Sequence, residues 1–375
     1  MSKRTVLQIA AYGIVCLAIL LVPSFMDDAF ILNKYARYLV LGILAIALSL
    51  SWGYAGILNL GQAASFGLGS YAMAMALKLR TIPVHTGKAG LPDFMVWNNV
   101  ETLPWFWEPF YSLTFAIFAG VAVPVVFAML LGSFIFRGRV TGVYVAIITL
   151  AALVVVNLLI IDQQRFSGGF NGITDLAQLE LFGLTFDAYG SSLYYLIAIS
   201  LTVSLFFALA VTKSKAGLIL QAIRDHEERV RYFGYDVARF KTFAFAVSAG
   251  IAGFAGMLYT IVMEFASPTF LGVQLSLSVV IWCAVGGRQS LLGAALGAIV
   301  VTGMQGALSE SEIFLETWTL IMGFIFVIVV LFLPKGLAGA VEMLVDRIFR
   351  KDHAAPDKSS VAASRRGVES KAEAP

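Results

Sequence analysis

The chain has 375 residues, of which 59% are hydrophobic and only 13% are charged, and its formal net charge is +3. Soluble globular domains carry about 25% charged residues, so this composition excludes an ordinary soluble protein. The net charge is small and no basic cluster alternates with aromatic residues, so nothing in the sequence indicates nucleic acid binding.

The hydropathy pattern predicts an all-α polytopic integral membrane protein, because about 20 apolar residues suffice for one transmembrane helix. We expect about ten such helices. Their predicted positions are 5–25, 36–57, 62–79, 110–133, 140–161, 191–211, 242–263, 274–288, 291–308 and 317–333.

The distribution of charge predicts the topology of these helices. With the N-terminus in the cytoplasm, 20 of the 26 Lys and Arg residues fall on the cytoplasmic side, and 13 of the 23 Asp and Glu residues fall on the other. This is the positive-inside pattern of membrane proteins. An even number of spans places the C-terminus in the cytoplasm as well.

The segments outside the spans differ in character. Residues 80–109 contain three prolines with Trp97, Trp105 and Trp107, which indicates a periplasmic loop lying at the membrane interface. We expect residues 1–345 to form one membrane domain. The tail at 346–375 is charged and rich in Ala and Ser, and is predicted to be a largely disordered cytoplasmic segment.

Glycine-rich segments interrupt the predicted helices at 52–67 and 282–297. A broken helix exposes backbone groups that a membrane tolerates only where protein or water covers them. In the first segment Asn59, Gly61 and Gln62 are candidates to line a substrate path, because an amide side chain both donates and accepts hydrogen bonds. The sequence leaves open the alternative that these are cytoplasmic turns whose amides cap or bridge helix ends.

Small residues recur at close spacing in two of the predicted spans. Their spacing favours close packing of helices in lipid over a role in ligand binding. The residues concerned are Ser248, Ala249, Ala252, Gly253, Gly256, Gly293 and Gly297.

The predicted spans contain no ionisable residue well inside their boundaries. This argues against an ion-coupled carrier and in favour of an uncharged substrate. No catalytic constellation, metal-ligand cluster or nucleotide-binding loop is present. The chain is therefore predicted not to be an enzyme, not to hydrolyse nucleotide itself, and to need no cofactor or metal.

The longest polar interruption of the apolar sequence is Lys213–Lys241, which holds seven of the 26 Lys and Arg residues. Gly234 lies where the C-terminus of a helix favours positive φ. The segment is predicted to form one or two short amphipathic helices on the cytoplasmic face, with an ordinary charged loop as the alternative. The apolar residues at helical spacing are Leu218, Ala222, Ile223, Val230 and Phe233.

Four stretches in this order resemble the branched-chain amino acid (LivM-type) permeases of ABC importers, and the resemblance covers nearly all of residues 35–337. They are WGYAGILNLGQAASFGLGSYAM from Trp52, SGGFNGITD from Ser167, GLILQAIRDHEERVRYFGY from Gly217 and WCAVGGRQSLLGAALGA from Trp282. The loop at 91–110 is similar more narrowly to the urea-type branch of this family, although Leu150 and Phe170 depart from the pattern of that branch.

The resemblance implies an importer of the bacterial cytoplasmic (inner) membrane. Its other components would be a sister permease subunit, two ATP-binding cassette ATPase subunits and a periplasmic substrate-binding protein. The 213–241 loop would couple the permease to the ATPases. The candidate coupling residues are Ala222, Ile223, Arg224, Asp225, Glu227, Arg229, Gly234 and Tyr235.

Three functions are compatible with these features. The first is a permease subunit that forms the translocation path for urea, and the second is the same kind of subunit for branched-chain or other amino acids. The third is a passive channel for urea or small amides. A channel needs no cytoplasmic docking helix, so the 213–241 loop argues against it.

Overall fold

The computed structural model describes residues 3–25, 28–81, 91–181 and 183–310, and a few residues between 317 and 339. The predicted tenth span at 317–333 lies largely outside these described residues, and the tail at 346–375 lies wholly outside them. Within the described part, the predicted all-α membrane fold is confirmed. The described strands are β1 (Leu179–Leu181) and β2 (Leu184–Phe186), which form one short antiparallel hairpin.

Nine long helices coincide with the first nine predicted spans. They are α1 (Lys3–Leu21), α2 (Ala29–Leu48), α3 (Gln62–Thr81), α5 (Leu113–Arg137), α6 (Val143–Asp162), α8 (Ser191–Lys213), α10 (Val237–Met263), α11 (Val273–Gly286) and α12 (Leu291–Ser309). In the described chain, six helices are long and apolar enough to cross a membrane: α2 with its extension to Tyr54, α5, α6, α8, α10 and α12. The predicted number of ten spans is therefore approximate.

The third predicted span forms a helix, α3, that is less apolar than the six helices just named. α3 is rich in small and polar residues, and all but three of its residues are buried. It lies among α5, α6 and α10, and the 3-10 helix η5 (Pro268–Leu271) also packs against it. Because protein rather than lipid surrounds α3, its sequence does not need the high hydropathy of a lipid-facing span.

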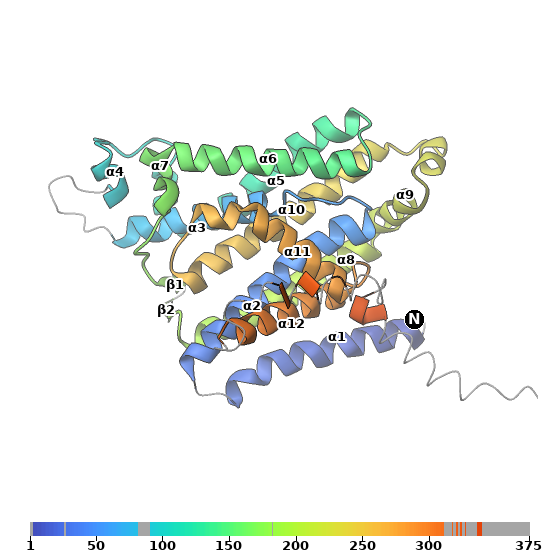
Figure 1. The fold of residues 1–375 in the computed structure, drawn as a ribbon, viewed down its shortest axis with the longest axis horizontal. Helices are drawn as coiled ribbons and strands as arrows, with labels where there is room; N and C mark the ends of the chain where they lie inside the picture. Colours follow the sequence, from blue (N-terminus) through green and yellow to red (C-terminus); the bar gives the residue numbers. More distant parts are fainter. Residues whose placement is uncertain are drawn as a thin grey trace, which may run out of the picture.

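The long helices are arranged around α2, α3 and α10 (Figure 1). In the most apolar window of α2 and of α10, 83% of residues are buried, against 22% for α6 at the edge. Side chains of α6 and α5 such as Leu158 and Phe134 remain exposed, as expected for helices that face lipid. The central helices therefore hold the interior of the protein.

Small residues bring these central helices together, which confirms the predicted packing role of their spacing. A Cβ atom added at Gly256 would lie 1.8 Å from the carbonyl oxygen of Phe66, and one at Gly253 would lie 2.5 Å from that of Gly120. Only a residue without a side chain allows backbones to approach so closely.

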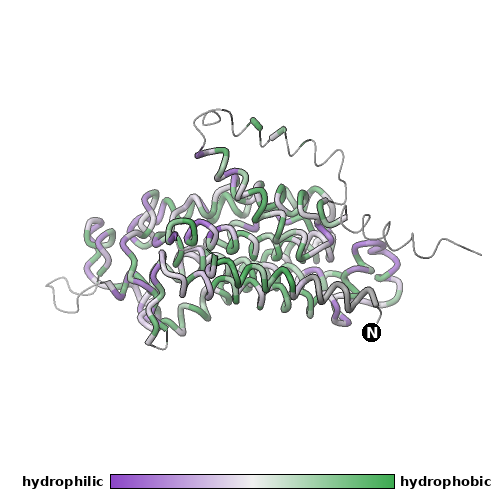
Figure 2. The backbone as a smooth tube through the Cα atoms, turned by 90° about the horizontal axis from the view of Figure 1, so that it is seen from below, coloured by the Kyte–Doolittle hydropathy of each residue, from purple (hydrophilic) through white to green (hydrophobic). Residues whose placement is uncertain are grey.

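Polar segments lie at the two ends of the helices, and apolar segments lie between them (Figure 2). One end holds α4 (Asp93–Trp97), α7 (Gln164–Ser167) and the β hairpin, whereas the N-terminus and α9 (Lys215–Tyr232) lie at the other (Figure 1). This arrangement agrees with the predicted topology. The remaining short helices are η1 (Val22–Ser24), η3 (Glu108–Tyr111) and η4 (Gly169–Asn171).

Two charged residues lie within the expected spans. Lys78 is in the last turn of α3, as expected for a residue at a span end, whereas Arg37 corrects the expectation that no ionisable residue lies well inside a span. Lys78 in α3 is only 3% exposed, and its ammonium lies 3.0 Å from a carboxylate oxygen of Asp93 and 3.5 Å from one of Asp175. Arg37 lies two turns into α2 and has no ion-pair partner among the described residues. In the sequence pattern Arg37 counts as a residue at a span end, because the span is predicted to begin at residue 36. The helix in fact begins at Ala29.

Candidate functional site

The polar segment between α8 and α10 folds as a helix that packs against the membrane body. Its bounds are narrower than the predicted loop, because α8 continues to Lys213 and α10 already begins at Val237. α9 is kinked at His226 (φ −152°, ψ 81°), so the prediction of one or two short helices is confirmed. Gly234 has a φ of +85°, as predicted for the residue that ends the helix.

The apolar residues of this segment divide between two faces. Leu220, Ile223 and Val230 are buried against the body. Ile223 and Val230 cluster with Val237, and Leu220 belongs to a neighbouring apolar cluster that includes Ile57 and Phe245. The predicted stripe was therefore wrong in part, because Leu218 and Phe233 are exposed instead. The exposed fractions are 61% for Leu218, 81% for Phe233 and 90% for the neighbouring Tyr232. α9 thus keeps a second apolar surface that nothing in the described chain covers.

Arg224 connects α9 to the broken end of α2. After Leu48 the helix widens into a π-helical segment, η2 (Ser49–Tyr54), before the chain turns. The Arg224 guanidinium donates from Nη1 to the carbonyl oxygen of Gly53 over 2.6 Å, and it also binds Asp225. The Arg224 side chain packs on Gly56, which has a φ of +72°. A carbonyl left free where the helix breaks thus finds a charged donor on α9.

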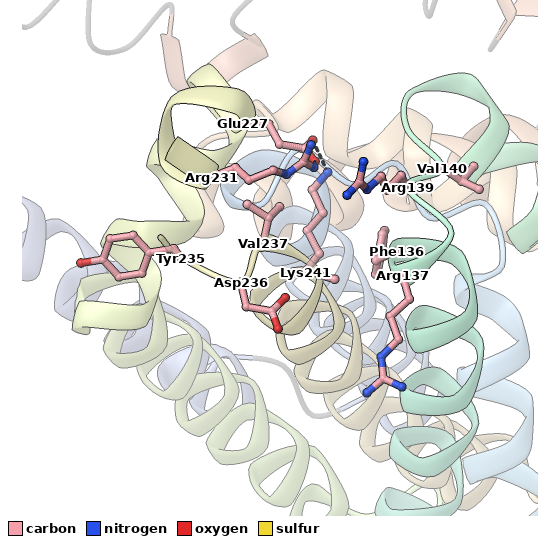
Figure 3. A pocket seen from close by; sticks show the side chains of 11 residues that line it. Phe136, Arg137, Arg139, Val140, Glu227, Arg231, Tyr235, Asp236, Val237 and Lys241 are labelled. Carbon is pink, nitrogen blue, oxygen red and sulfur yellow. Dashed lines mark hydrogen bonds and ion pairs between the residues drawn. The ribbon is translucent and has the colours of Figure 1, made fainter. Parts of the chain in front are cut away.

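Glu227 holds α9 to the start of α10. Its two carboxylate oxygens accept hydrogen bonds from Arg231 (2.9 Å) and Lys241 (2.5 Å). Figure 3 shows both cations reaching this carboxylate, with Arg139 directed into the same space and Tyr235 pointing away from it. These side chains line a pocket of about 290 Å³ between the C-terminal end of α5 and the N-terminal end of α10.

The remaining predicted coupling residues are on the outside of α9. Ala222, Arg229 and Tyr235 are exposed, and Arg229 has no ion-pair partner among the described residues. The Tyr235 ring packs edge-on against Phe240 of α10. Of the eight predicted residues, Ile223, Arg224 and Glu227 therefore bind the segment to the body, and the others lie on or near its free surface.

Asn59 and Gln62 lie side by side inside the protein, 2% and 0% exposed. Asn59 Nδ2 donates to Gln62 Oε1 over 2.6 Å, and Asn59 Oδ1 accepts a hydrogen bond from the backbone N–H of Gly61. Gln62 Nε2 donates to the hydroxyl and carbonyl oxygens of Ser248 on α10. The two amides thus use their hydrogen-bonding groups on one another and on neighbouring helices.

Hydroxyl groups complete this buried layer, and sequence reasoning did not assign them to it. Thr149 Oγ1 accepts a hydrogen bond from Leu60 N (3.1 Å), and Ser276 Oγ accepts one from Ala63 N (3.0 Å). The Ser248 hydroxyl in turn donates to the carbonyl oxygen of Ala47 (2.6 Å). These residues come from α6, α11 and α10, so no spacing along the sequence could have grouped them.

Gly61 lets the backbone before α3 pass close to α6, because it has no side chain. A Cβ atom there would lie 2.5 Å from the carbonyl oxygen of Thr149. The structure therefore brings Asn59, Gly61 and Gln62 together at the start of α3, where the helix would otherwise leave free N–H groups. A role of these residues in a substrate path stays a prediction.

The fold is that of a multi-helix membrane protein with a broken central helix, and the candidate site is a charged surface helix at one end. The family model "Branched-chain amino acid transport system / permease component" matches residues 30–330. The chain belongs to this family of permeases. This confirms the family resemblance and the predicted multi-pass placement in the inner membrane.

Similar curated proteins carry related names. The chain is 30% identical to the high-affinity branched-chain amino acid transport system permease protein LivM of Escherichia coli, over 53% of this chain and 51% of that protein. It is 28% identical to the protein of the same name from Salmonella typhimurium, over 79% of this chain and 67% of that protein. A ribose import permease protein, RbsC of Haemophilus influenzae, is 24% identical over 54% of this chain.

The aligned region spans about half the length of the E. coli relative. No solved structure matches the chain significantly.

Proposed function

We propose that the chain is the permease subunit of an ABC importer for branched-chain amino acids. The family match over residues 30–330 carries this proposal, because it covers the broken α2–α3 region, α9 and nearly every described helix. In such a machine, the permease supplies the route through the membrane and separate subunits supply the energy.

The comparisons change the order of the two substrates considered from the sequence. The family description and the two LivM relatives name branched-chain amino acids, and none of them names urea. We therefore place the amino acid function first and keep urea as the second candidate. The similarity of the 91–110 loop to urea-type permeases still favours urea. The argument for an uncharged substrate from the charge-free spans is weakened by Arg37.

α9 is proposed to be the element that contacts the ATPases. Its exposed apolar residues Leu218, Tyr232 and Phe233 could enter a groove on a partner, and its exposed charges would fix the orientation at the rim. Movement of α9 would reach the broken end of α2 through the bond from Arg224 to Gly53. A helical element that is bonded to a second element is a physical route for such a switch.

The proposed partners are two ATPase subunits, a sister permease and a periplasmic substrate-binding protein. The end that holds α4 is proposed to face the binding protein. There Lys78 of α3 reaches both Asp93 and Asp175, which ties α4 and the segment after α7 to a central helix. A binding protein seated on this end would therefore press on a surface that is coupled to the core.

Uptake in a strain that lacks only this chain tests the proposal. Labelled leucine and labelled urea are measured separately, with and without the chain restored from a plasmid. We expect restoration to return ATP-dependent leucine uptake. Uptake of urea alone would favour the second candidate, and unchanged uptake of both solutes in the deletion strain would contradict the importer function.

A further inference from the structure

A groove of about 350 Å³ lies between α2, α10, α11 and α12. Its volume is at the lower end of the range of roughly 300–1,000 Å³ found for small-molecule sites. Polar side chains predominate, and no charged side chain is among the described residues that line it. The lining residues are Tyr38, Leu41, Tyr259, Thr269, Gln274, Leu275, Ser278, Trp282, Thr302, Gln305, Gly306 and Ser309.

Two amide side chains in this groove lack partners. Neither Gln274 nor Gln305 makes a side-chain hydrogen bond within the described chain, whereas the Ser278 hydroxyl is used on the carbonyl oxygen of Gln274. An unpaired amide facing lipid would cost several kcal/mol in the hydrocarbon region. The groove must therefore be in contact with water, a solute or another polar surface.

Arg37 does not line the groove, but it brings a positive charge near two residues that do. It precedes the lining residue Tyr38 on α2, and it is close enough to interact electrostatically with both Tyr38 and Tyr259. Its Nε is buried without a hydrogen bond, and its Nη1 reaches only the sulfur of Met263, at 3.9 Å. Arg37 is only partly buried, but its Nε is enclosed without a hydrogen-bond partner and no carboxylate of the described chain pairs with it, so a carboxylate brought by a ligand would be bound favourably.

The groove lies toward the end of the helices opposite to α9. Ser309 is the last residue of α12, and Glu310 directly after it forms an ion pair with Lys34 near the start of α2. Trp282 lies two turns further along α11 than Gln274 and forms the inner limit of the groove. In the predicted topology, a solute would enter this groove from the periplasmic side.

We propose that this groove is the outer part of the solute path and binds an aliphatic α-amino acid, with its carboxylate near Arg37. The hydroxyl and amide groups would bind the ammonium group, and the side chain would lie against Leu41, Leu275 and Trp282. The sister permease would close the open side. This inference rests on the proposed importer function and adds the place and chemistry of solute binding.

Access from outside is tested by thiol labelling of the full importer in whole cells. Gln305→Cys and Gln274→Cys should react with a small water-soluble methanethiosulfonate reagent, and saturating leucine should slow both reactions. Met304→Cys and Leu277→Cys are matched controls, because Met304 is one residue from Gln305 and Leu277 three residues from Gln274, and both are exposed on the same helices but outside the groove. Equal reactivity of groove and control positions, or no reaction at the groove positions, would overturn the inference.

Leucine uptake by variants tests whether Arg37 and Gln305 bind the solute. Arg37→Met should lower leucine uptake about tenfold, the effect of losing one charge-assisted hydrogen bond. Arg37→Lys should restore part of the uptake because it keeps the charge. Gln305→Met should lower uptake in the same direction, whereas Met304→Leu should not. Amounts of assembled complex are measured by co-purification with the ATPases, so that a folding defect is recognised.

These outcomes separate the inference from the function on which it rests. If leucine uptake does not depend on the chain at all, both are overturned. If it depends on the chain but Arg37→Met and Gln305→Met transport normally, the importer function stands and the groove is not the path.

Discussion

The Arg224 guanidinium donates a hydrogen bond of 2.6 Å to the carbonyl oxygen of Gly53, which joins the surface helix α9 to the π-helical end of α2. Gly53 also meets the segment before α12, since a Cβ atom there would lie 1.7 Å from the carbonyl oxygen of Arg288. Ser49 donates to that same carbonyl oxygen (2.9 Å). One short segment therefore contacts both α9 and the second glycine-rich interruption, so these two elements share one neighbour.

Replacing Arg224 by Met should uncouple transport while the protein still reaches the membrane. A hydrogen bond to a charged group contributes about 1.5–3 kcal/mol, so a tenfold or greater loss of ATP-driven uptake and of stimulated ATPase activity is expected. Arg239→Met is the matched control, because Arg239 is 82% exposed and pairs only with Asp236 three residues earlier. Normal coupled transport by Arg224→Met would remove the proposed coupling role.

Replacing Glu227 by Gln should loosen α9 from α10. The change removes the carboxylate that Arg231 and Lys241 share, and Lys241 is only 11% exposed. We expect a loss of about 1–3 kcal/mol in the stability of this contact, seen as faster hydrogen exchange in α9. Glu228→Gln is the control, since Glu228 is exposed and has no ion pair among the described residues. Equal exchange in both variants would show that the network does not hold the helix.

The amides of Asn59 and Gln62 allow a double-mutant cycle. Asn59→Ala and Gln62→Ala each leave a buried partner without its hydrogen bond, so each should destabilise the protein by about 1–3 kcal/mol. Because the two side chains bind one another, the double variant should lose less than the sum of the single changes. Thermal unfolding of the purified protein measures this.

Uptake by the same variants tests the predicted role in the substrate path. The comparison is made per assembled complex, so that lower stability does not count as lower transport. A path role requires that leucine or urea uptake falls in complexes that assemble normally. If uptake per assembled complex is the same in the variants as in the unchanged protein, the two amides have a structural role only.

Labelling can also determine on which side of the membrane α4 lies. Glu101 is exposed, so Glu101→Cys is a better probe than a cysteine at Asn98, whose side chain donates to the carbonyl oxygen of Phe94 (2.7 Å). We expect an impermeant thiol reagent to label Glu101→Cys in whole cells. Glu228→Cys on α9 should react only after lysis. The reverse pattern would invert the predicted topology.

The sequence alone determined the class of the protein, the long helices at the first nine predicted spans and the polar segment that became α9. Long apolar stretches specify helices because a membrane leaves no other partner for the backbone. The family followed from stretches such as SGGFNGITD, whose order along the chain is readable without coordinates. Positive φ at Gly234 was also predictable, because it depends on residues adjacent in sequence.

Only the tertiary structure decided which polar residues meet. Asn59 and Gln62 join hydroxyls from three other helices, and Arg224 finds its acceptor at a residue 171 positions away. It also decided that Leu218 and Phe233 are exposed while Leu220 and Ile223 are buried, which depends on the side from which the body approaches α9. Helical spacing specifies that a helix has faces, but the neighbours that pack on it determine which face is covered.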